Sequence, residues 1–476
     1  MSKQPNILWL CSDQQRYDTI HALGNEYIDT PNLDKLCERG TAFNCAYTQS
    51  PVCTPSRASF LSGKYPSLIN ANILGGQNLP EHCTLIPKAL ADSGYVCGNI
   101  GKLHISAAWG GHENRGEDGY QEFIYSLGSG HDLENGCSAY KDWLDRKGID
   151  WHTLFTNDGK HDYYWYREDA PMDLRQTAWC AEEAISFIER HSAEGKPWML
   201  SVNCFDPHPP YDAPLELVEK YLERKLPDPI FADSVYEDRE KLKVIRHQTP
   251  EFKAPDDDVR RKKASYYGMC EIVDRHFGWI IDAVDRLGIR ENTLIIYTSD
   301  HGEMLGDHGL TLKGCRFYEG AVRVPLIFSM PGTVKEGMVT ETLAELTDIA
   351  PTIAELCGVE FKDVHGHSLI PKMAVNPDRP YEPREFVRCE YHNANNDKGG
   401  LLPPLHATMY RDERYKLVTY HTADVGQLYD MIEDPQELNN LWDKEEYLPL
   451  VFKLTKRSYD LAAVLERPGQ VRVGRY

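Results

Sequence analysis

Polar side chains that can bind a cation or carry a proton follow several apolar runs of the sequence. They are Asp13-Gln14, Lys102 with His104, His208, and Asp300-His301. Residues just past the carboxyl ends of strands converge in an α/β sheet, so we expect these side chains to lie together. Two carboxylates, an amide oxygen and an imidazole would form a divalent-cation site, where oxygen ligands favour calcium or magnesium and the nitrogen admits manganese. Taken singly, each pair also fits another role, since an aspartate after a strand often caps the next helix.

One cysteine, Cys53, has a context that the other cysteines lack. Pro55 suits the first turn of a helix and Gly63 suits its end, which places Cys53 at a helix N-terminus. The helix dipole and Arg57 would stabilise negative charge there, so a thiolate and a bound oxyanion both fit. A phosphatase-type thiolate loop does not fit, because it needs a longer spacing than the three residues that separate Cys53 from Arg57.

Apolar runs that alternate with helical stretches predict the fold. The runs that are long enough for buried strands lie at 6–11, 95–100, 198–205, 293–299 and 324–329. Helix-capping residues bound the stretches 30–40, 84–94 and 347–358, and apolar residues recur at helical spacing over 257–287. This alternation predicts an α/β protein with a large mixed, mostly parallel sheet flanked by helices.

Other stretches predict insertions and a second, smaller unit. The polar segments 109–172 and 209–256 have weak periodicity, and we expect them to lie over one edge of the sheet. After about residue 371 the chain becomes rich in proline and charge, and short alternating strands with a terminal helix near 448–461 indicate an antiparallel α+β subdomain. We therefore predict a catalytic domain over 1–375 and a C-terminal subdomain over 376–476.

Composition excludes several classes of protein. The net charge of −21 over 476 residues excludes a basic nucleic-acid binder. Thirteen cysteines without a CxxC pair argue against a disulfide framework or a zinc module. No apolar run resembles a signal peptide or a membrane span, so we predict a cytoplasmic protein with no membrane and no nucleic-acid partner.

The motifs together resemble the type I sulfatases of the alkaline phosphatase superfamily. The signature of that family is C-x-P-S-R followed by Leu-x-Gly-Lys/Arg, and residues 53–57 and 61–64 match it. Asp13-Gln14, Lys102, His104, His208, Asp300-His301 and Lys313 also fall in the order of the family. The similarity spans nearly the whole chain, including the tail, and implies the alkaline phosphatase-like fold with its small C-terminal subdomain.

The resemblance implies a chemistry as well as a fold. It implies that a maturase converts Cys53 to formylglycine, and that one hydroxyl of the hydrated aldehyde attacks sulfur while the other expels sulfate. It also implies one divalent cation, Ca²⁺ in the first place with Mn²⁺ or Mg²⁺ as alternatives. The implied cation ligands are Asp13, Gln14, residue 53, Asp300 and His301. The implied catalytic residues are Arg57 and Lys102 beside the nucleophile, His104 as base, and His208 with Lys313 at the sulfuryl and leaving oxygens.

Two positions depart from the commoner pattern of the family. Gln14 and His301 stand where an aspartate and an asparagine are usual, so only two carboxylates remain among the implied ligands. Less negative charge should weaken retention of the cation and make it a stronger Lewis acid. Relatives that hydrolyse phosphonate monoesters and phosphodiesters share this combination, and such a hydrolase is the alternative to a sulfatase.

The substrate and the partners are less defined by the sequence. The acidic net charge modestly favours a small or singly sulfated ester, although a saccharide or aryl sulfate also fits. His112, His131 and the aromatic run 161–167 could stack on a sugar ring, or simply pack a loop against the body. We also predict a homo-oligomer. A binding protein without turnover would result if Cys53 stayed unmodified.

Overall fold

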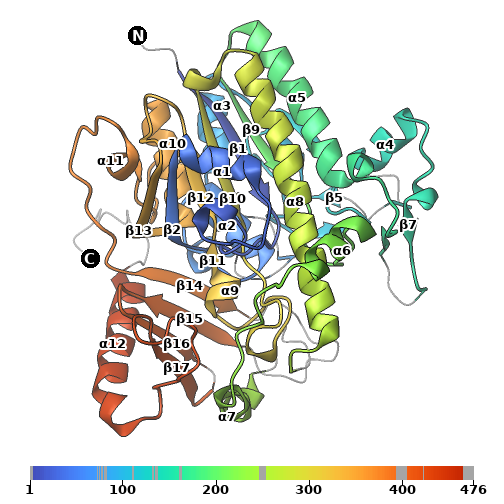
Figure 1. Ribbon diagram of the computed structural model, residues 1–476. Helices are drawn as coiled ribbons and strands as arrows, with labels where there is room; N and C mark the ends of the chain where they lie inside the picture. The colour runs from blue at the N-terminus through green and yellow to red at the C-terminus, as the bar shows by residue number, and fades with distance from the viewer. Residues whose placement is uncertain are drawn as a thin grey trace.

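A twisted central sheet with helices on both faces forms the larger part of the molecule (Figure 1). The computed structural model describes residues 4–464 except 72, 74, 77–78, 80–82, 110–111, 131–132, 135–137, 160–162, 246–253, 393–404 and 422. Within these residues the sheet has nine strands in the order β11-β2-β12-β10-β1-β9-β3-β6, with β13 beside β2. Their bounds are β1 (Asn6–Ser12), β2 (Thr41–Tyr47), β3 (Val96–Gly101), β6 (Glu122–Tyr125), β9 (Trp198–Asn203), β10 (Thr293–Ser299), β11 (Arg323–Val324), β12 (Leu326–Ser329) and β13 (Met338–Glu345).

The strand β1 lies at the centre of the sheet and is buried on both faces. It pairs in parallel with β10 on one side and with β9 on the other. Ile7 and Trp9 pack into one apolar core and Leu8 and Leu10 into the other. Continuous apolar runs such as β1 and β10 are what a parallel strand covered on both faces requires.

Two sets of helices cover the two faces of the sheet. The first set consists of α1 (Pro31–Glu38), α5 (Gln176–Glu194) and α8 (Asp257–Arg286), which pack over Leu8 and Leu10. The second set consists of α2 (Cys53–Ser62), α3 (Ile86–Asp92) and α10 (Ile349–Cys357), which pack over Ile7 and Trp9. Figure 1 shows the long helices α5 and α8 running side by side on one face. None of the described helices combines the length and apolar character that a bilayer crossing requires.

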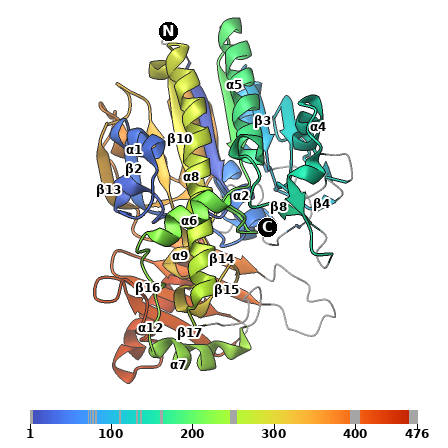
Figure 2. The same ribbon diagram turned by 45° about the vertical axis from the view of Figure 1, so that its right-hand side comes forward.

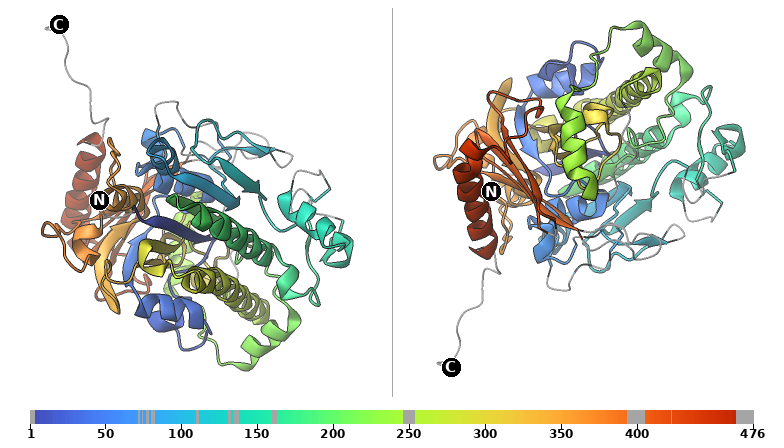
Figure 3. Two further views of the ribbon diagram at one scale, coloured as in Figure 1. Left: turned by 90° about the horizontal axis from the view of Figure 1, so that it is seen from above. Right: turned by 90° about the horizontal axis from the view of Figure 1, so that it is seen from below.

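A second sheet follows in the C-terminal part of the chain (Figure 2). Its four antiparallel strands are β14 (Val387–His392), β15 (His406–Arg411), β16 (Tyr415–Tyr420) and β17 (Val425–Asp430). One face packs against α12 (Leu448–Val464), and the other packs against the larger part of the molecule. Figure 3 shows α12 on the outer side of this sheet, away from α5 and α8. The predicted division at residue 375 lies before β14 and stays a prediction.

The predicted α/β class with a small antiparallel α+β unit is confirmed, and several details differ. Pro325 divides the run 324–329 into β11 and β12, and both pair antiparallel to their neighbours. The segment 109–172 is not wholly an insertion, because β6 within it joins the main sheet beside β3. Five further short elements lie in this segment or at its start: β4 (Ala108–Trp109), β5 (His112–Glu113), α4 (Ala139–Arg146), β7 (Phe155–Thr156) and β8 (Trp165–Tyr166). The segment 209–256 contains two helices, α6 (Leu215–Glu223) and α7 (Ser234–Lys241).

A buried cluster of charges joins the two sheets. The ammonium group of Lys416, on β16, lies 3.0 Å from a carboxylate oxygen of Glu319 and 2.7 Å from one of Glu437. Glu319 begins the short helix α9 (Glu319–Val322), and its carboxylate also accepts a hydrogen bond of 2.9 Å from the hydroxyl of Tyr47. Lys416 is fully buried. Because buried carboxylates need a partner charge, Lys416 holds the C-terminal sheet in place.

We expect Lys416→Met to lower the free energy of unfolding by about 3–5 kcal/mol, because Glu437 would lose its ion-pair partner and Glu319 would be left with the longer ion pair of 3.6 Å with Arg323. The measurement is urea unfolding followed by circular dichroism. The matched control is Lys456→Met, which removes an exposed pair with Asp460 and should cost at most about 0.5 kcal/mol. Equal unfolding midpoints for the two variants would contradict the structural role of Lys416.

Candidate active site

Cys53 is the first residue of the helix α2, which is buried along its whole length. The preceding residue, Val52, is extended, and the helix ends at Gly63, which has a φ of 66°. A left-handed residue at this position is the usual way to end a helix, and glycine adopts it without strain. The sequence prediction of a helix from Cys53 to Gly63 is therefore confirmed.

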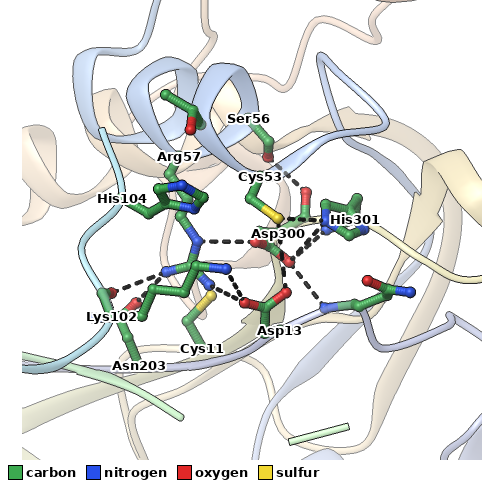
Figure 4. A network of polar contacts seen from close by, with 12 residues as sticks. Cys11, Asp13, Cys53, Ser56, Arg57, Lys102, His104, Asn203, Asp300 and His301 are labelled. Carbon is green, nitrogen blue, oxygen red and sulfur yellow. Dashed lines mark hydrogen bonds and ion pairs between the residues drawn. The ribbon is translucent and has the colours of Figure 1, made fainter. Parts of the chain in front are cut away.

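The carboxyl ends of β1 and β10 place two carboxylates side by side. Ser12 and Ser299 are paired in register, and Asp13 and Asp300 follow them directly. Ligand atoms of Asp13, Cys53, Asp300 and His301 all lie within 4.8 Å of one another, and all four residues are buried. The sulfur of Cys53 is 3.1 Å from Nε2 of His301 and 3.9 Å from a carboxylate oxygen of Asp13 (Figure 4).

Two cations neutralise these carboxylates from the other side. Arg57 donates a hydrogen bond of 2.8 Å from Nε to Asp300, and Lys102 donates to Asp13 (Figure 4). Burial alone would raise the pKa of Asp13, but the surrounding positive groups, Lys102 first and Arg57 among the others, together outweigh it and hold that pKa below its ordinary value. A second nitrogen of Arg57 donates to the side chain of Asn203 at 3.1 Å. The same nitrogen donates to the carbonyl oxygen of Lys102 at 3.1 Å, so the guanidinium is held at the ends of β10, β9 and β3.

His208 and Lys313 form a pair beside the carboxylates. Nζ of Lys313 lies 2.6 Å from Nε2 of His208, and Nδ1 of His208 lies 2.7 Å from the carbonyl oxygen of Pro209. An ammonium can only donate and a carbonyl can only accept, so the proton of the neutral imidazole is on Nδ1. Burial and the charge of Lys313 hold the pKa of His208 well below its ordinary value.

Residues Gln14 and His104 complete the set, and both have a left-handed backbone. The φ angles are 66° for Gln14 and 58° for His104. The backbone N–H of Gln14 donates to Asp300 at 3.0 Å, and its side-chain oxygen accepts from Lys313. Such backbone conformations are uncommon for residues other than glycine and tend to gather at functional sites.

The structure gathers the ten residues that the sequence singled out, nine of them joined by these contacts and His104 beside them (Figure 4). They are Asp13, Gln14, Cys53, Arg57, Lys102, His104, His208, Asp300, His301 and Lys313. Sequence reasoning passed over Asn203, Glu303 and Ser56, whose hydroxyl donates to the carbonyl of Asp300 at 2.5 Å. Asn203 is the last residue of β9 and Glu303 follows Asp300 closely, so their places at strand ends were the only available signal.

The expected aromatic wall is only partly described. His131, His161, Asp162 and the side chain of His112 lie outside the described residues. Tyr166 is buried and stacks on Phe155 with ring centroids 4.3 Å apart. This residue therefore packs the loop against the body rather than facing a ligand.

The donor set fits a hard divalent cation. It offers carboxylate oxygens, an amide oxygen and one imidazole nitrogen, which are ligands that calcium, magnesium and manganese accept. Among the described side chains, one terminal nitrogen of Arg57 and Nδ1 of His104 are buried and have no hydrogen-bond partner. Donors left free at this point suit an anionic group beside residue 53.

Comparison with known proteins identifies the family. A family model described as Sulfatase matches residues 5–359, which is most of the chain. The chain belongs to the sulfatase family. A second model, described as N-sulphoglucosamine sulphohydrolase, C-terminal, matches residues 306–463. The resemblance seen in the motifs is thus confirmed, and the family implies a divalent-metal site.

Curated relatives and solved structures agree with this assignment. The enzyme is 29% identical to an arylsulfatase of Clostridium perfringens, over 95% of this chain and 93% of the relative. It is 30% identical to a choline-sulfatase of Rhizobium meliloti, over 92% and 82% of the two chains. Among solved structures it superposes on a phosphonate monoester hydrolase of Agrobacterium radiobacter with a TM-score of 0.81 and 25% identity, covering 98% and 96% of the two chains.

We expect Asp300→Asn to weaken binding of Ca²⁺ and Mn²⁺ by more than the roughly 10–100-fold that loss of an outer-shell partner costs. The measurement is the rise in melting temperature when each cation is added to chelator-treated protein. A cation at about a hundred times its Kd stabilises the folded state by about 2.7 kcal/mol, so a large rise is expected for the unchanged enzyme. The control is Asp145→Asn, an exposed residue of α4. A cation-induced rise in Asp300→Asn equal to that of the control would refute the assignment.

Proposed function

We propose that the enzyme hydrolyses sulfate esters at residue 53, after Cys53 has been converted to formylglycine. The observation that carries this proposal is the position of Cys53. It lies at the N-terminus of a buried helix, within 4.8 Å of two carboxylates and an imidazole that follow adjacent strands. Formylglycine supplies, once hydrated, one hydroxyl that attacks sulfur and a second whose deprotonation releases sulfate.

The electrostatic surroundings support an ionised nucleophile at this position. Burial opposes ionisation of the Cys53 thiol, but Lys102 and Lys313, with smaller contributions from His301 and His104, together outweigh it and hold its pKa well below the ordinary value. The same charges would stabilise an ionised hydroxyl in place of the thiol. Arg57, which is held by Asp300, adds a further positive charge near Cys53. We assign Arg57 and Lys102 to this stabilisation.

A divalent cation fits the four neighbouring ligands Asp13, Gln14, Asp300 and His301. Such an ion would supply positive charge to the nucleophile and to a sulfate oxygen. The oxygen-rich donor set favours Ca²⁺, and the imidazole of His301 keeps Mn²⁺ as the alternative, with Mg²⁺ third.

The remaining residues are placed to handle protons. We assign His104 to removing the proton from the second hydroxyl of residue 53, because it is among the groups that stabilise the ionised side chain of Cys53. Lys313 and His208 would bind the sulfuryl oxygens. Because Nε2 of His208 accepts from Lys313, the proton that reaches the leaving oxygen comes from the ammonium group of Lys313.

The substrate that we propose is a small, aryl or saccharide sulfate ester. The relatives named arylsulfatase and choline-sulfatase support the small esters, and an N-acetylglucosamine-6-O-sulfatase of Bacteroides thetaiotaomicron, 26% identical over 98% of this chain, supports the saccharide esters. The partner implied by the chemistry is a formylglycine-generating maturase. A cytoplasmic location and a homo-oligomer stay predictions. The likeness to the phosphonate monoester hydrolase keeps hydrolysis of phosphonate monoesters or phosphodiesters as the second candidate.

We expect the peptide that contains residue 53, isolated from the native host, to carry an aldehyde in place of the thiol. Mass spectrometry measures this directly. Parallel assays should show faster release of an aryl alcohol from a sulfate than from a phosphonate. Cys53→Ala should abolish both activities, whereas Cys37→Ala, which alters another buried cysteine, should retain them. Turnover by the Cys53→Ala variant would refute the mechanism, and a preference for the phosphonate would favour the second candidate.

We expect Lys313→Met to raise the pKa of His208, because removal of the ammonium charge removes a repulsion that disfavours the imidazolium. Burial remains, so the pKa should stay below the ordinary value of about 6.5. The measurement is a histidine titration by nuclear magnetic resonance, with the signal assigned by its loss in His208→Gln. Lys456→Met, which lies on α12, should leave the signal unchanged. An unshifted His208 signal in Lys313→Met would show that the two side chains do not interact in solution.

A further inference from the structure

A buried carboxylate that the proposed chemistry does not use, Glu303, lies behind Gln14. Its side chain is fully buried and comes from the loop that leads from His301 to Lys313. The amide nitrogen of Gln14 donates to one oxygen of Glu303, while the amide oxygen of Gln14 accepts from Nζ of Lys313. Gln14 is therefore bound at both ends of its side-chain amide.

Only one orientation of that amide satisfies both partners. A carboxylate can only accept a hydrogen bond and an ammonium can only donate one. The two ends of an amide are nearly identical in size, so hydrogen-bond partners decide which way it faces. With its nitrogen bound to Glu303, the amide of Gln14 leaves its oxygen on the side of Lys313.

Glu303 is itself held without help from Gln14. Its other oxygen accepts from the backbone N–H of Leu305 at 3.0 Å and from that of Leu312. Its own backbone N–H donates to the carbonyl of Gly320 at 2.8 Å. The neighbouring Gly302 allows this close approach, because a Cβ there would lie 2.0 Å from the same carbonyl oxygen. The carboxylate thus has a fixed position against which Gln14 is oriented.

We infer that Glu303 is a positioning residue that turns the oxygen of Gln14 toward the cation and lends the site a third negative charge through that amide. The inference rests on the cation site of the proposed function. A neutral amide in direct contact with a cation is a weak ligand, and a hydrogen bond from its nitrogen to a carboxylate makes its oxygen more negative. Glu303 thus partly replaces, by polarising Gln14, the negative charge that an aspartate would bring at position 14.

The test compares Mn²⁺ affinity, measured by calorimetry on chelator-treated protein with matched conversion at residue 53. In Glu303→Gln, the side-chain oxygen of residue 303 can still accept from the backbone N–H groups of Leu305 and Leu312. The new amide nitrogen of residue 303 then faces the amide nitrogen of Gln14. Gln14 must turn over to avoid this clash. We expect Mn²⁺ affinity to fall by about 10–100-fold, with an unchanged melting temperature in chelator.

A double variant that exchanges the carboxylate and the amide between positions 14 and 303 distinguishes this role of Glu303 from a merely structural one. In the double variant Gln14→Glu with Glu303→Gln, the new amide donates to the new carboxylate, and the other carboxylate oxygen faces the cation. We expect this variant to recover Mn²⁺ affinity to within about twofold of the unchanged chain. Glu390→Gln, which alters a buried glutamate of β14, is the matched control and should bind Mn²⁺ normally.

The outcomes separate this inference from the proposed function. Absence of Mn²⁺ binding by the unchanged chain would overturn the cation site itself, and this inference with it. Normal binding by Glu303→Gln, or a loss that the double variant does not recover, would overturn the role of Glu303 alone. If Glu303→Gln does not fold, the double variant tests the inference by itself, because it keeps both the negative charge and the hydrogen bonds. Weak Mn²⁺ binding by the folded double variant would overturn the inference.

Discussion

Two buried carboxylates held side by side at the ends of β1 and β10 are the constraint on which the rest of the structure depends. Asp13 and Asp300 follow residues that are paired in register, so the sheet itself forces like charges together. A buried charge without a partner costs several kcal/mol. Lys102 from the end of β3 and Arg57 from α2 supply those partners. Burial of the two carboxylates is therefore energetically affordable only when the sheet and the helix α2 are both in place.

The compensating charges are arranged around one position. Asp13 and Asp300 lie at the strand ends, and Lys102 and Lys313 donate hydrogen bonds to Asp13 and to Gln14. Residue 53 lies where these two groups meet, so a cation and an anion can be held next to each other. The field there is local and strong because water is excluded. The acidic net charge of the whole chain therefore does not prevent binding of an anionic substrate.

Much of this arrangement could be predicted because it depends on local patterns. Continuous apolar runs followed by Asp13 and Asp300 indicate buried parallel strands with polar ends, and Pro55 and Gly63 delimit the helix of Cys53. Other features depend on contacts between distant segments. The strands β2 and β13 were not predicted, since β13 is half exposed and carries no continuous apolar run. Glu303 has no spacing signature, and only its hydrogen bond to Gln14 reveals it.

The burial of α2 also has a consequence for the biogenesis of the enzyme. Every residue of this helix is buried, and Cys53 is only 2% exposed. Ala58, Phe60 and Leu61 of this helix belong to the apolar core between the sheet and α10, so a second protein could not draw residue 53 out of the fold without removing part of that core. Any enzyme that alters Cys53 must therefore meet the chain while it is still unfolded. On the proposed chemistry, the state of residue 53 would therefore be decided before the chain folds.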